Sequence, residues 1–415
     1  MPFDLNAVRA KFPALAITDD GQRRIYFDNP AGTQVPASVA EAMSDCLLTS
    51  SANLGGNFPT SDRADEIVAS ARGAMADFLN APSHDEIVFG QNMTTITLHL
   101  SRSIGRLFRP GDEIILSCMD HDANVWPWVL LARDLELEVK WLPFDATTFE
   151  FDLSTLDELL TDRTRLVCVG GASNLTGTLN DVTTICTKAR AAGALTYIDA
   201  VQSVPHVATD VQALGCDFLV CSPYKFFGPH QGVLWGRRDV LEQLEPYKVR
   251  PAPSNIPGCF ETGTQSHEGF AGITAAIDYF AWIGQSMAGE KERPQALRAA
   301  MEMLFDYEKS LAGHLIDGLQ AIDGVTVQGI TSPDAMDRRV PTVSFTHSRV
   351  ASDVVAESLV KENIFVWSGH NYAVEVAKTL GIYESGGTVR VGPMHYNSES
   401  EIDECLEALG RILAA

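Results

Sequence analysis

Short apolar runs rich in β-branched residues alternate with amphipathic stretches through the middle of the chain, and this alternation constrains the fold more than any other feature. Arg165–Gly170 and Leu195–Asp199 are almost continuously apolar, which is typical of parallel strands covered on both faces. Between them, residues 181–192 have a helical pattern that stops at Gly193. This alternation predicts a mostly parallel α/β sheet covered by helices. The other predicted strands are residues 86–89, 112–117, 137–142, 218–221 and 232–235.

The pattern changes after Gly272, where long helices and short strands replace the regular alternation. The clearest helix is predicted from Pro294 to about Asp323, and strands at residues 325–328, 342–345 and 364–367 predict a smaller α+β domain. At about 150 residues per domain, a chain of 415 residues holds roughly two to three domains. We expect an N-terminal segment that packs with the small domain (residues 1–25), a large domain (residues 26–285) and a small C-terminal domain (residues 286–415).

The chain is acidic, with 54 Asp and Glu residues against 31 Lys and Arg residues and a net charge of −23. This charge repels nucleic acid and anionic lipid, so we expect neither a nucleic-acid nor a membrane partner. The amino-terminal sequence does not resemble a secretory signal, and no stretch approaches the ~18 apolar residues of a membrane helix. The eight cysteines include no CxxC pair and no zinc-like Cys/His spacing. We therefore expect a cytoplasmic protein with reduced thiols and no metal.

Asp199 and Lys225 are the first candidates for chemistry. Asp199 ends an apolar strand, and a carboxylate at that end of a parallel strand points to the crevice where such sheets bind ligands. Lys225 follows a second buried strand and has aromatic and apolar neighbours, which desolvate the amine and lower its pKa. Such a lysine can form a Schiff base with a carbonyl. An acid for a pyridinium nitrogen and a Schiff-base lysine are together what pyridoxal phosphate chemistry requires.

The segments Asp199-x-x-Gln202 and Ser222-x-x-Lys225, in this order and spacing, resemble those of class V aminotransferases of fold type I. Within that group the chain is similar to cysteine-desulfurase-like proteins, from the Tyr26–Ala31 segment to Arg390 and beyond. The resemblance implies a large domain with a mostly parallel seven-stranded sheet and a smaller C-terminal α+β domain. It also implies an enzyme that uses pyridoxal 5'-phosphate to act on a small amino acid.

The resemblance implies a cofactor-binding role for several further residues. Met93 and Thr94 open a predicted helix and would hold the cofactor phosphate with free amides and a hydroxyl. Ser222 would add a second hydroxyl, and Tyr224 would do part of the work of the histidine that cysteine desulfurases have before the lysine. His121 would stack on the pyridine ring and shuttle protons, with a pKa suited to neutral pH. The implied catalytic residues are thus Lys225 and His121.

The resemblance also implies how substrate and a second subunit are bound. Asn174 and Gln202 would hydrogen-bond the phenolic oxygen of the cofactor or the substrate. Arg390 would bind the substrate α-carboxylate, because its planar guanidinium pairs with carboxylates through two hydrogen bonds. Thr264 would reach the phosphate bound by the neighbouring subunit. We therefore expect a homodimer with a shared active site.

One segment departs from the pattern of the group-II cysteine desulfurases, which carry the loop Arg-Thr-Gly-His-His-Cys. Their cysteine accepts sulfur as a persulfide. The matching segment here is Trp367–Ala373, with Tyr372 in the place of the cysteine and Trp367 in the place of the arginine. A phenol cannot accept sulfane sulfur, so another thiol such as Cys259 or Cys221 would have to do so. We expect Trp367 and Tyr372 to line the substrate mouth and to favour a larger or apolar side chain.

These observations leave several functions open. The leading hypothesis is a lyase that cleaves the C–S or C–Se bond of a cysteine derivative by β-elimination without an enzyme persulfide on the usual loop. Alternatives on the same scaffold are an amino-acid epimerase, for which Tyr224 or Tyr372 would supply a proton from the second face, and an aminotransferase. A further alternative is a pseudoenzyme that acts as a partner-binding dimer in sulfur transfer. The motif residues name neither the substrate nor a protein acceptor.

Overall fold

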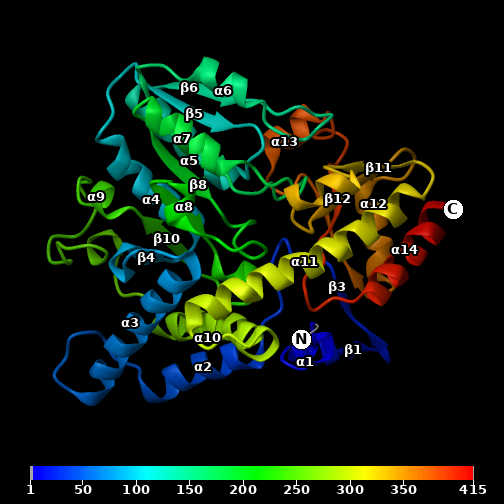
Figure 1. Cartoon of the computed structure of the whole chain (residues 1–415), viewed down its shortest axis with the longest axis horizontal. Coiled ribbons are helices and arrows are strands. Elements are labelled where there is room, and N and C mark those ends of the chain that lie inside the picture. Colours follow the sequence, from blue (N-terminus) through cyan, green and yellow to red (C-terminus); the bar gives the residue numbers. More distant parts are fainter. Residues whose placement is uncertain (1–2, 415) are drawn as a thin grey trace.

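A seven-stranded sheet with the spatial order β4-β10-β9-β8-β7-β5-β6 is the largest sheet of the computed structural model, which describes residues 3–414, and lies in the left-hand part of Figure 1. From β9 to β6 all neighbouring strands are parallel, and β10 is antiparallel to both β9 and β4. The predicted mostly parallel seven-stranded sheet is therefore confirmed. The strands are β4 (Ile87–Gly90), β5 (Glu113–Ser117), β6 (Glu138–Leu142), β7 (Thr164–Gly170), β8 (Leu195–Asp199), β9 (Phe218–Cys221) and β10 (Gly232–Gly236).

The central strands are apolar throughout because each one faces two cores. In β7, Val167 and Val169 lie in one core, and Leu166 and Cys168 lie in the other. Helices on the Val167 side are α3 (Pro59–Leu79), α6 (Leu153–Leu159), α7 (Val182–Ala191), α8 (Val211–Leu214), α10 (His267–Ile283) and α11 (Arg293–Gln320), with α2 (Ala37–Thr49) packed on α10. Helices on the Leu166 side are α4 (Met93–Gly105), α5 (Trp126–Leu135) and α9 (Arg238–Leu241).

The C-terminal part contains a separate four-stranded antiparallel sheet with the order β11-β12-β15-β14. Its apolar residues, together with those of α12, α14 and the second half of α11, form a third core. A smaller α+β unit was expected here, and the structure contains one. The elements are β11 (Val325–Gln328), β12 (Val343–His347), β14 (Trp367–Gly369), β15 (Thr388–Val391), α12 (Ser352–Val360), α13 (Val374–Thr379) and α14 (Glu399–Ala414).

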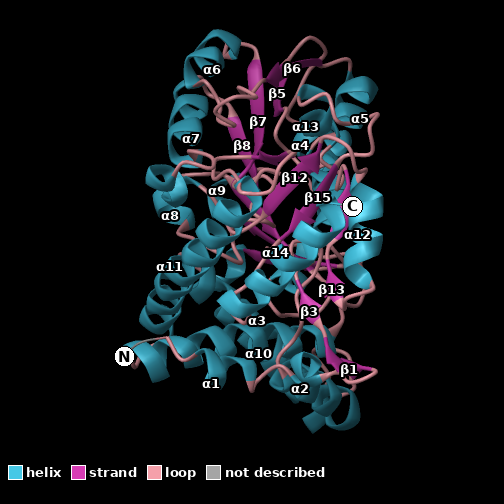
Figure 2. Cartoon of the chain, turned by 90° about the vertical axis from the view of Figure 1, so that its right-hand side faces the viewer, coloured by secondary structure: helices cyan, strands magenta, loops and turns pink. Residues whose placement is uncertain are grey.

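The strand predicted at residues 364–367 is two strands in the structure. β13 (Ile364–Phe365) pairs in parallel with β3 (Ile25–Tyr26), beside which it lies in Figure 2, whereas β14 pairs with β15. The two halves of one apolar run therefore join different sheets, because their pairing partners come from opposite ends of the chain. The remaining N-terminal elements are α1 (Leu5–Arg9), β1 (Thr18–Asp19) and β2 (Gln22–Arg23).

Helix α11 belongs to both parts of the molecule. Leu304 lies in the core on the Val167 side of the large sheet, and Leu311 lies in the third core. Between them, the fully buried Glu308 accepts a hydrogen bond from the backbone N–H of His395 (3.0 Å) and pairs with the ring Nδ1 of His206 (2.7 Å). The middle of α11 is thus tied to the loop after β8 and to the loop after β15.

The domain boundaries predicted after residues 25 and 285 stay predictions. Met1, Pro2 and Ala415, at the outer ends of the predicted units, lie outside the described residues. Within residues 3–414 no helix has the length and the apolar character needed to cross a bilayer.

Two glycine-to-alanine variants test the packing of α10 against α11. A Cβ at Gly284, where α10 ends, would lie 1.9 Å from the backbone oxygen of Ala296, whereas a Cβ at Gly313, inside α11, would have no atom within 4 Å. We expect Gly284→Ala to lower the free energy of unfolding by about 1–3 kcal/mol through overpacking. Gly313→Ala should raise it by about 0.5–1 kcal/mol through the helix preference of alanine. Equal thermal unfolding midpoints for the two variants would contradict this packing.

Candidate active site

A cavity of about 330 Å³ lies where the carboxyl ends of β8 and β9 meet the C-terminal sheet. It brings together every site residue predicted from the sequence except Thr264. It also contains residues to which the sequence assigned no role, among them Pro30 and Asn371. The lining residues are Pro30, Ala31, Met93, Thr94, His121, Gly170, Ala172, Asn174, Asp199, Val201, Gln202, Ser222, Tyr224, Lys225, Trp367, Asn371, Tyr372 and Arg390.

Lys225 lies in a short 3₁₀ turn, Pro223–Lys225, directly after β9. Its Nζ donates a hydrogen bond to the backbone oxygen of Pro30 and lies 4.9 Å from the centre of the Tyr224 ring. Burial, reinforced by the positive charge of Arg390, lowers the pKa of Lys225 to about 7. A large fraction of this amine is therefore neutral and nucleophilic at neutral pH.

Asp199 is the last residue of β8, the strand next to β9 in the sheet. Its Oδ1 accepts a hydrogen bond from the backbone N–H of Val201 (2.9 Å). Burial raises the pKa of Asp199 to about 6, although the Val201 bond and the charge of Lys225 oppose this rise. The parallel pairing of the two strands thus places a carboxyl group and an amine on the walls of one cavity.

The N-terminus of α4 forms another part of the wall through Met93 and Thr94. The side chain of Asn92 caps this helix by accepting from the backbone N–H of Thr95 (2.8 Å). The first N–H groups of a helix have no intrahelical acceptor, so the amides of Met93 and Thr94 remain free for an anion. The buried Ser222 lines the same cavity from the end of β9.

His121 is held in one orientation by its own turn. Its Nδ1 accepts a hydrogen bond from the backbone N–H of Ala123 (3.0 Å), so the neutral ring carries its proton on Nε2. Burial, with the charges of Lys225 and Arg390, lowers the pKa of His121 to about 3. The sequence predicted a pKa suited to neutral pH. That expectation is wrong for this cavity, because burial and two cations disfavour the imidazolium.

The buried Asp120 orders the backbone next to His121. It accepts hydrogen bonds from the Ser117 hydroxyl, from the backbone N–H of Gly170 (2.8 Å) and from the Asn124 side chain (2.6 Å). These contacts connect the ends of β5 and β7 to the turn that contains His121. The His121 side chain therefore has a defined place on the cavity wall.

Arg390, on β15, brings a nearly buried guanidinium into the cavity. Its Nη1 donates to the backbone oxygen of Asn174 (3.0 Å), and its buried Nε has no hydrogen-bond partner. The Asn174 side chain donates to the backbone oxygen of Asn371 (2.7 Å), which leaves its buried Oδ1 without a donor. Burial lowers the pKa of Arg390 to about 10, so the group stays charged at neutral pH. A free donor and a free acceptor next to this charge are suited to a polar, anionic ligand.

Gln202 lines the cavity and is fixed by a residue that the sequence did not identify. Its Nε2 donates to the hydroxyl of Thr342 (2.9 Å), just before β12. Thr342 is far away in the sequence and belongs to no motif around Gln202, so only the fold brings the two together.

Trp367 and Tyr372 lie at the mouth of the cavity and are 54% and 67% exposed. The Tyr372 ring stacks on His121 with a centroid distance of 5.3 Å and an interplanar angle of 21°. Asn371 and Tyr372 have φ angles of 51° and 60°, which are uncommon for residues other than glycine. The backbone oxygen of Tyr372 accepts from the N–H of Asp122 (2.8 Å). The loop is therefore anchored, with the tyrosine ring covering His121.

Thr264 is exposed and does not line the cavity of this chain. Its predicted contact with the phosphate of a neighbouring subunit stays a prediction.

The cavity lining contains no cysteine. Cys259 and Cys221 are buried in the core on the Leu166 side and the Val167 side of the sheet, respectively. Burial raises the pKa of both thiols, so neither is a reactive thiolate.

Comparison with known proteins agrees with this geometry. The aminotransferase class-V family model matches residues 25–405. The chain is 32% identical over 427 aligned positions to a cysteine desulfurase of Pectobacterium carotovorum subsp. carotovorum, covering 99% of this chain and 98% of that protein. It is 31% identical to a cysteine desulfurase of Yersinia pestis, with 99% of each covered.

Comparison with solved structures also finds cysteine desulfurases. The apo cysteine desulfurase of Thermococcus onnurineus NA1 has a TM-score of 0.88 at 28% identity, with 100% of both chains covered. The cysteine desulfurase CsdA of Escherichia coli, in its S-sulfonic acid form, has a TM-score of 0.85 at 27% identity, covering 100% of this chain and 99% of that chain. The fold and the site define a pyridoxal-phosphate enzyme of fold type I. The chain belongs to the aminotransferase class-V family, within which it is cysteine desulfurase-like.

The cavity residues fit pyridoxal 5'-phosphate, the cofactor of this family. The free amides at the start of α4 and the hydroxyl of Ser222 suit a phosphate. Asp199 would provide a carboxyl group for a ring nitrogen, and Lys225 would provide an amine that is neutral enough to react with an aldehyde.

Replacing Arg390 tests whether the two cations in the cavity influence each other. We expect Arg390→Gln to raise the pKa of Lys225 by roughly one unit, because a nearby positive charge disfavours the protonated amine. The measurement is the pH dependence of the rate at which the apoprotein binds pyridoxal. Its midpoint should be near pH 7 in the parent protein and higher in the variant. Arg349→Gln, at an exposed position, is the control. Equal midpoints in the parent and both variants would contradict the coupling.

Proposed function

We propose that the protein is a pyridoxal-phosphate-dependent lyase that cleaves the C–S or C–Se bond of a cysteine derivative without forming a persulfide on the enzyme. The supporting observation is one cavity that combines the neutral amine of Lys225 and the guanidinium of Arg390 but has no cysteine in its lining. The cysteine desulfurases among its relatives suggest the substrate class.

The cofactor would be held at its two ends by different elements. Met93 and Thr94 at the start of α4, with Ser222, would bind the phosphate, and Asp199 would hold a proton on the pyridine nitrogen. Gln202 would hydrogen-bond the phenolic oxygen, and His121 would stack on the ring. When bound, pyridoxal phosphate supplies an electron sink for negative charge at the substrate α-carbon.

Side chains of the protein would bind the substrate carboxylate and move the proton of the α-carbon. Arg390 would bind the α-carboxylate through its free donors, next to the free Oδ1 of Asn174. Lys225 would take the proton from the α-carbon and hold it while the β-substituent leaves, because its lowered pKa lets it act as a base at neutral pH. His121 is neutral and would act as a hydrogen-bond donor through Nε2.

The sulfur or selenium group would leave the cavity without passing to the protein. Tyr372 occupies the place that we predict for the sulfur-accepting cysteine of the desulfurases, and a phenol is not a sulfur acceptor. When the Cβ–S bond breaks, sulfur leaves with the bonding electron pair as a thiolate or sulfinate. The enamine that remains hydrolyses to pyruvate and ammonia. Alanine would form instead from cysteine sulfinate, whose sulfur leaves as sulfur dioxide while the bonding electron pair stays on Cβ and takes up a proton. Trp367 and Tyr372, at the mouth, would contact a large or apolar substituent on that sulfur.

We further propose a homodimer in which Thr264 of each subunit completes the phosphate site of the other. The exposed position of Thr264, away from its own cavity, is compatible with this role. All eight cysteines are free, which supports a reducing, cytoplasmic location.

An amino-acid epimerase is the second candidate. The observation that favours it is that the phenol side chains of Tyr224 and Tyr372 line the same cavity as Lys225, so that a second proton-bearing group is available. A partner-binding protein without catalysis has no such support, because Lys225, Asp199, His121 and Arg390 all line one cavity.

Product analysis with a substrate panel separates these candidates. The holoenzyme is incubated in deuterated water with cysteine, cysteine sulfinate, cysteine S-conjugates and selenocysteine. A lyase releases sulfide, thiol or selenide together with pyruvate and ammonia, or sulfite together with alanine from cysteine sulfinate. Racemisation with α-deuteration and no released sulfur or selenium would instead identify an epimerase and contradict the lyase.

Replacing Tyr372 tests the missing acceptor directly. We expect Tyr372→Cys to gain a persulfide in the presence of cysteine, because the exposed loop position faces the cavity. Intact-protein mass spectrometry would show an added sulfur atom that reductant removes. The parent protein and Tyr372→Ser should show none. A persulfide of equal yield in all three proteins would mean that another cysteine accepts sulfur.

A further inference from the structure

Asp28 lies directly behind the cavity wall that contains Arg390. It follows β3 and precedes Pro30 and Ala31, which line the cavity. Asp28 forms a parallel bridge with Gly392, and the N–H of Gly392 donates to the backbone oxygen of Phe27 (2.7 Å). The segment with Asp28 is therefore paired with the chain that continues from Arg390.

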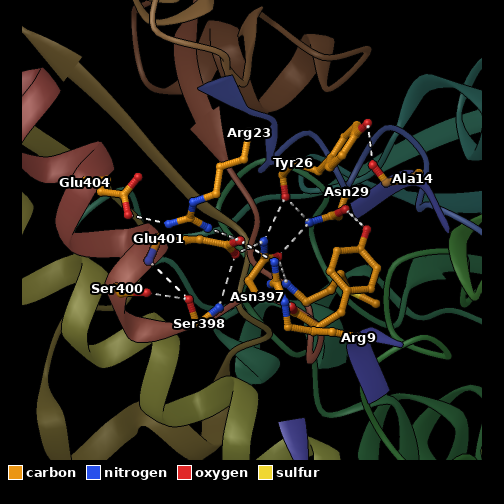
Figure 3. A network of polar contacts seen from close by, with 12 residues as sticks. Arg9, Ala14, Arg23, Tyr26, Asn29, Asn397, Ser398, Ser400, Glu401 and Glu404 are labelled. Carbon is orange, nitrogen blue, oxygen red and sulfur yellow. Dashed lines mark hydrogen bonds and ion pairs between the residues drawn. The ribbon is translucent and has the colours of Figure 1, made fainter. Parts of the chain in front are cut away.

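A buried network fixes the residue next to Asp28 (Figure 3). The Asn29 side chain donates to the backbone oxygens of Gly392 (2.7 Å) and Tyr26 (2.9 Å). Asn397 links it to Glu401, which forms an ion pair with Arg9 (2.9 Å). The backbone at Asp28 is thus held on both sides, next to the segment that continues from Arg390.

The ion pair between Asp28 and Arg390 is incomplete. Asp28 Oδ1 lies 3.9 Å from Arg390 Nη2, which is too far for a hydrogen bond. Both Asp28 Oδ1 and Arg390 Nε are buried and have no hydrogen-bond partner. The carboxylate therefore balances the charge of the arginine and leaves hydrogen-bond donors of the guanidinium free.

We propose that Asp28 is the resting counter-ion of Arg390 and takes up a proton from solvent when a substrate α-carboxylate binds to that arginine. This inference rests on the proposed role of Arg390 in carboxylate binding. Asp28 would be a positioning residue, because it acts through Arg390 and does not line the cavity.

The charges around Asp28 support this exchange. The charged groups that act on it are Arg390, from β15, and Lys225, from the turn after β9, and both lower its pKa. Burial outweighs them and raises the pKa of Asp28 to about 6. A bound carboxylate would share the charge of Arg390 and place a second negative charge nearby, which raises the pKa further. Tyr224 and Asp199 act on Arg390 and Lys225, respectively.

The exchange also affects the lysine. The negative charge of Asp28 raises the pKa of Lys225, and a bound carboxylate would add a second negative charge nearby. Protonation of Asp28 would offset that second charge. The pKa of Lys225 would therefore stay low, and its amine would stay neutral when the proton of the α-carbon is to be removed.

Carboxylate binding to the holoenzyme tests the proposal, with propionate as the probe because it has no amino group to react with the cofactor. Calorimetry in buffers of different ionisation enthalpy measures the protons taken up. The pKa of Asp28 is higher in the complex, so uptake occurs above the free value of about 6. We expect uptake approaching one proton per propionate near neutral pH. The affinity should fall by up to about tenfold per pH unit from about pH 6 to 8.

The matched variant is Asp28→Asn, which removes the charge and keeps the size of the side chain. It should bind propionate without proton uptake and with an affinity that does not change over this pH range. Absence of uptake in the parent protein, or equal uptake in parent and variant, overturns the proposal. Uptake that persists in the variant would belong to Lys225. The parent measurement decides the question even when the variant does not fold.

A second variant separates this proposal from the proposed function. Arg390→Gln should abolish propionate binding, and unchanged binding would contradict the role of Arg390 itself. A third result is also informative: propionate binding could require Arg390 and yet have the same pH dependence in the parent and in Asp28→Asn. That result would support the role of Arg390 and refute only the proposed role of Asp28 as its counter-ion. In steady-state assays, Asp28→Asn should flatten the pH profile of KM and alter kcat less, an effect that a purely structural role would not produce.

Discussion

Two basic side chains, Lys225 and Arg390, share one cavity, and the arrangement of the site follows from this constraint. Arg390 lowers the pKa of Lys225, and the carboxyl groups of Asp28 and Asp199 raise it. Free amides at the start of α4 add further positive potential. Such a cavity is suited to two anionic groups, a phosphate and a carboxylate. The net charge of −23 on the chain does not prevent this, because potential inside a cleft is set by nearby groups with little water between them.

The large sheet and much of the site could be predicted because their signals are local. β7 and β8 are continuous apolar runs, and Asp199 and Lys225 stand at strand ends in a recognisable spacing. Interactions between distant segments were not predictable. Thr342 belongs to no motif, yet its hydroxyl accepts the hydrogen bond that orients Gln202. Asp28 comes close to Arg390 only after the segments around β3 and β15 have been brought together. The pKa of His121 is lowered by burial and by the charges of Lys225 and Arg390, which lie on other elements. The sequence next to His121 therefore contains no sign of this shift.

Tyr372 illustrates how a single side chain changes what a loop can do. The loop backbone is anchored to Asn174 and Asp122 whatever side chain it carries. A thiol there would collect sulfur, whereas the phenol ring rests on His121 and narrows the approach to it. Under the proposed function, the loop would form a wall of fixed shape at the cavity mouth and would not take part in group transfer. Selection among substrates would then depend on what fits past Trp367 and Tyr372.

The position of Glu308 has a consequence for how the small sheet could move relative to the large sheet. It lies midway along α11, between the half of the helix that packs on the large sheet and the half that packs on the small one, and it is bonded to the loops after β8 and β15. β8 carries Asp199 and β15 carries Arg390. If the small sheet rotated about α11 relative to the large sheet, the residues around Glu308 would therefore move least. Because Arg390 lies on β15, such a movement would tilt its guanidinium over the cavity while the hydrogen bonds of Glu308 stay in place.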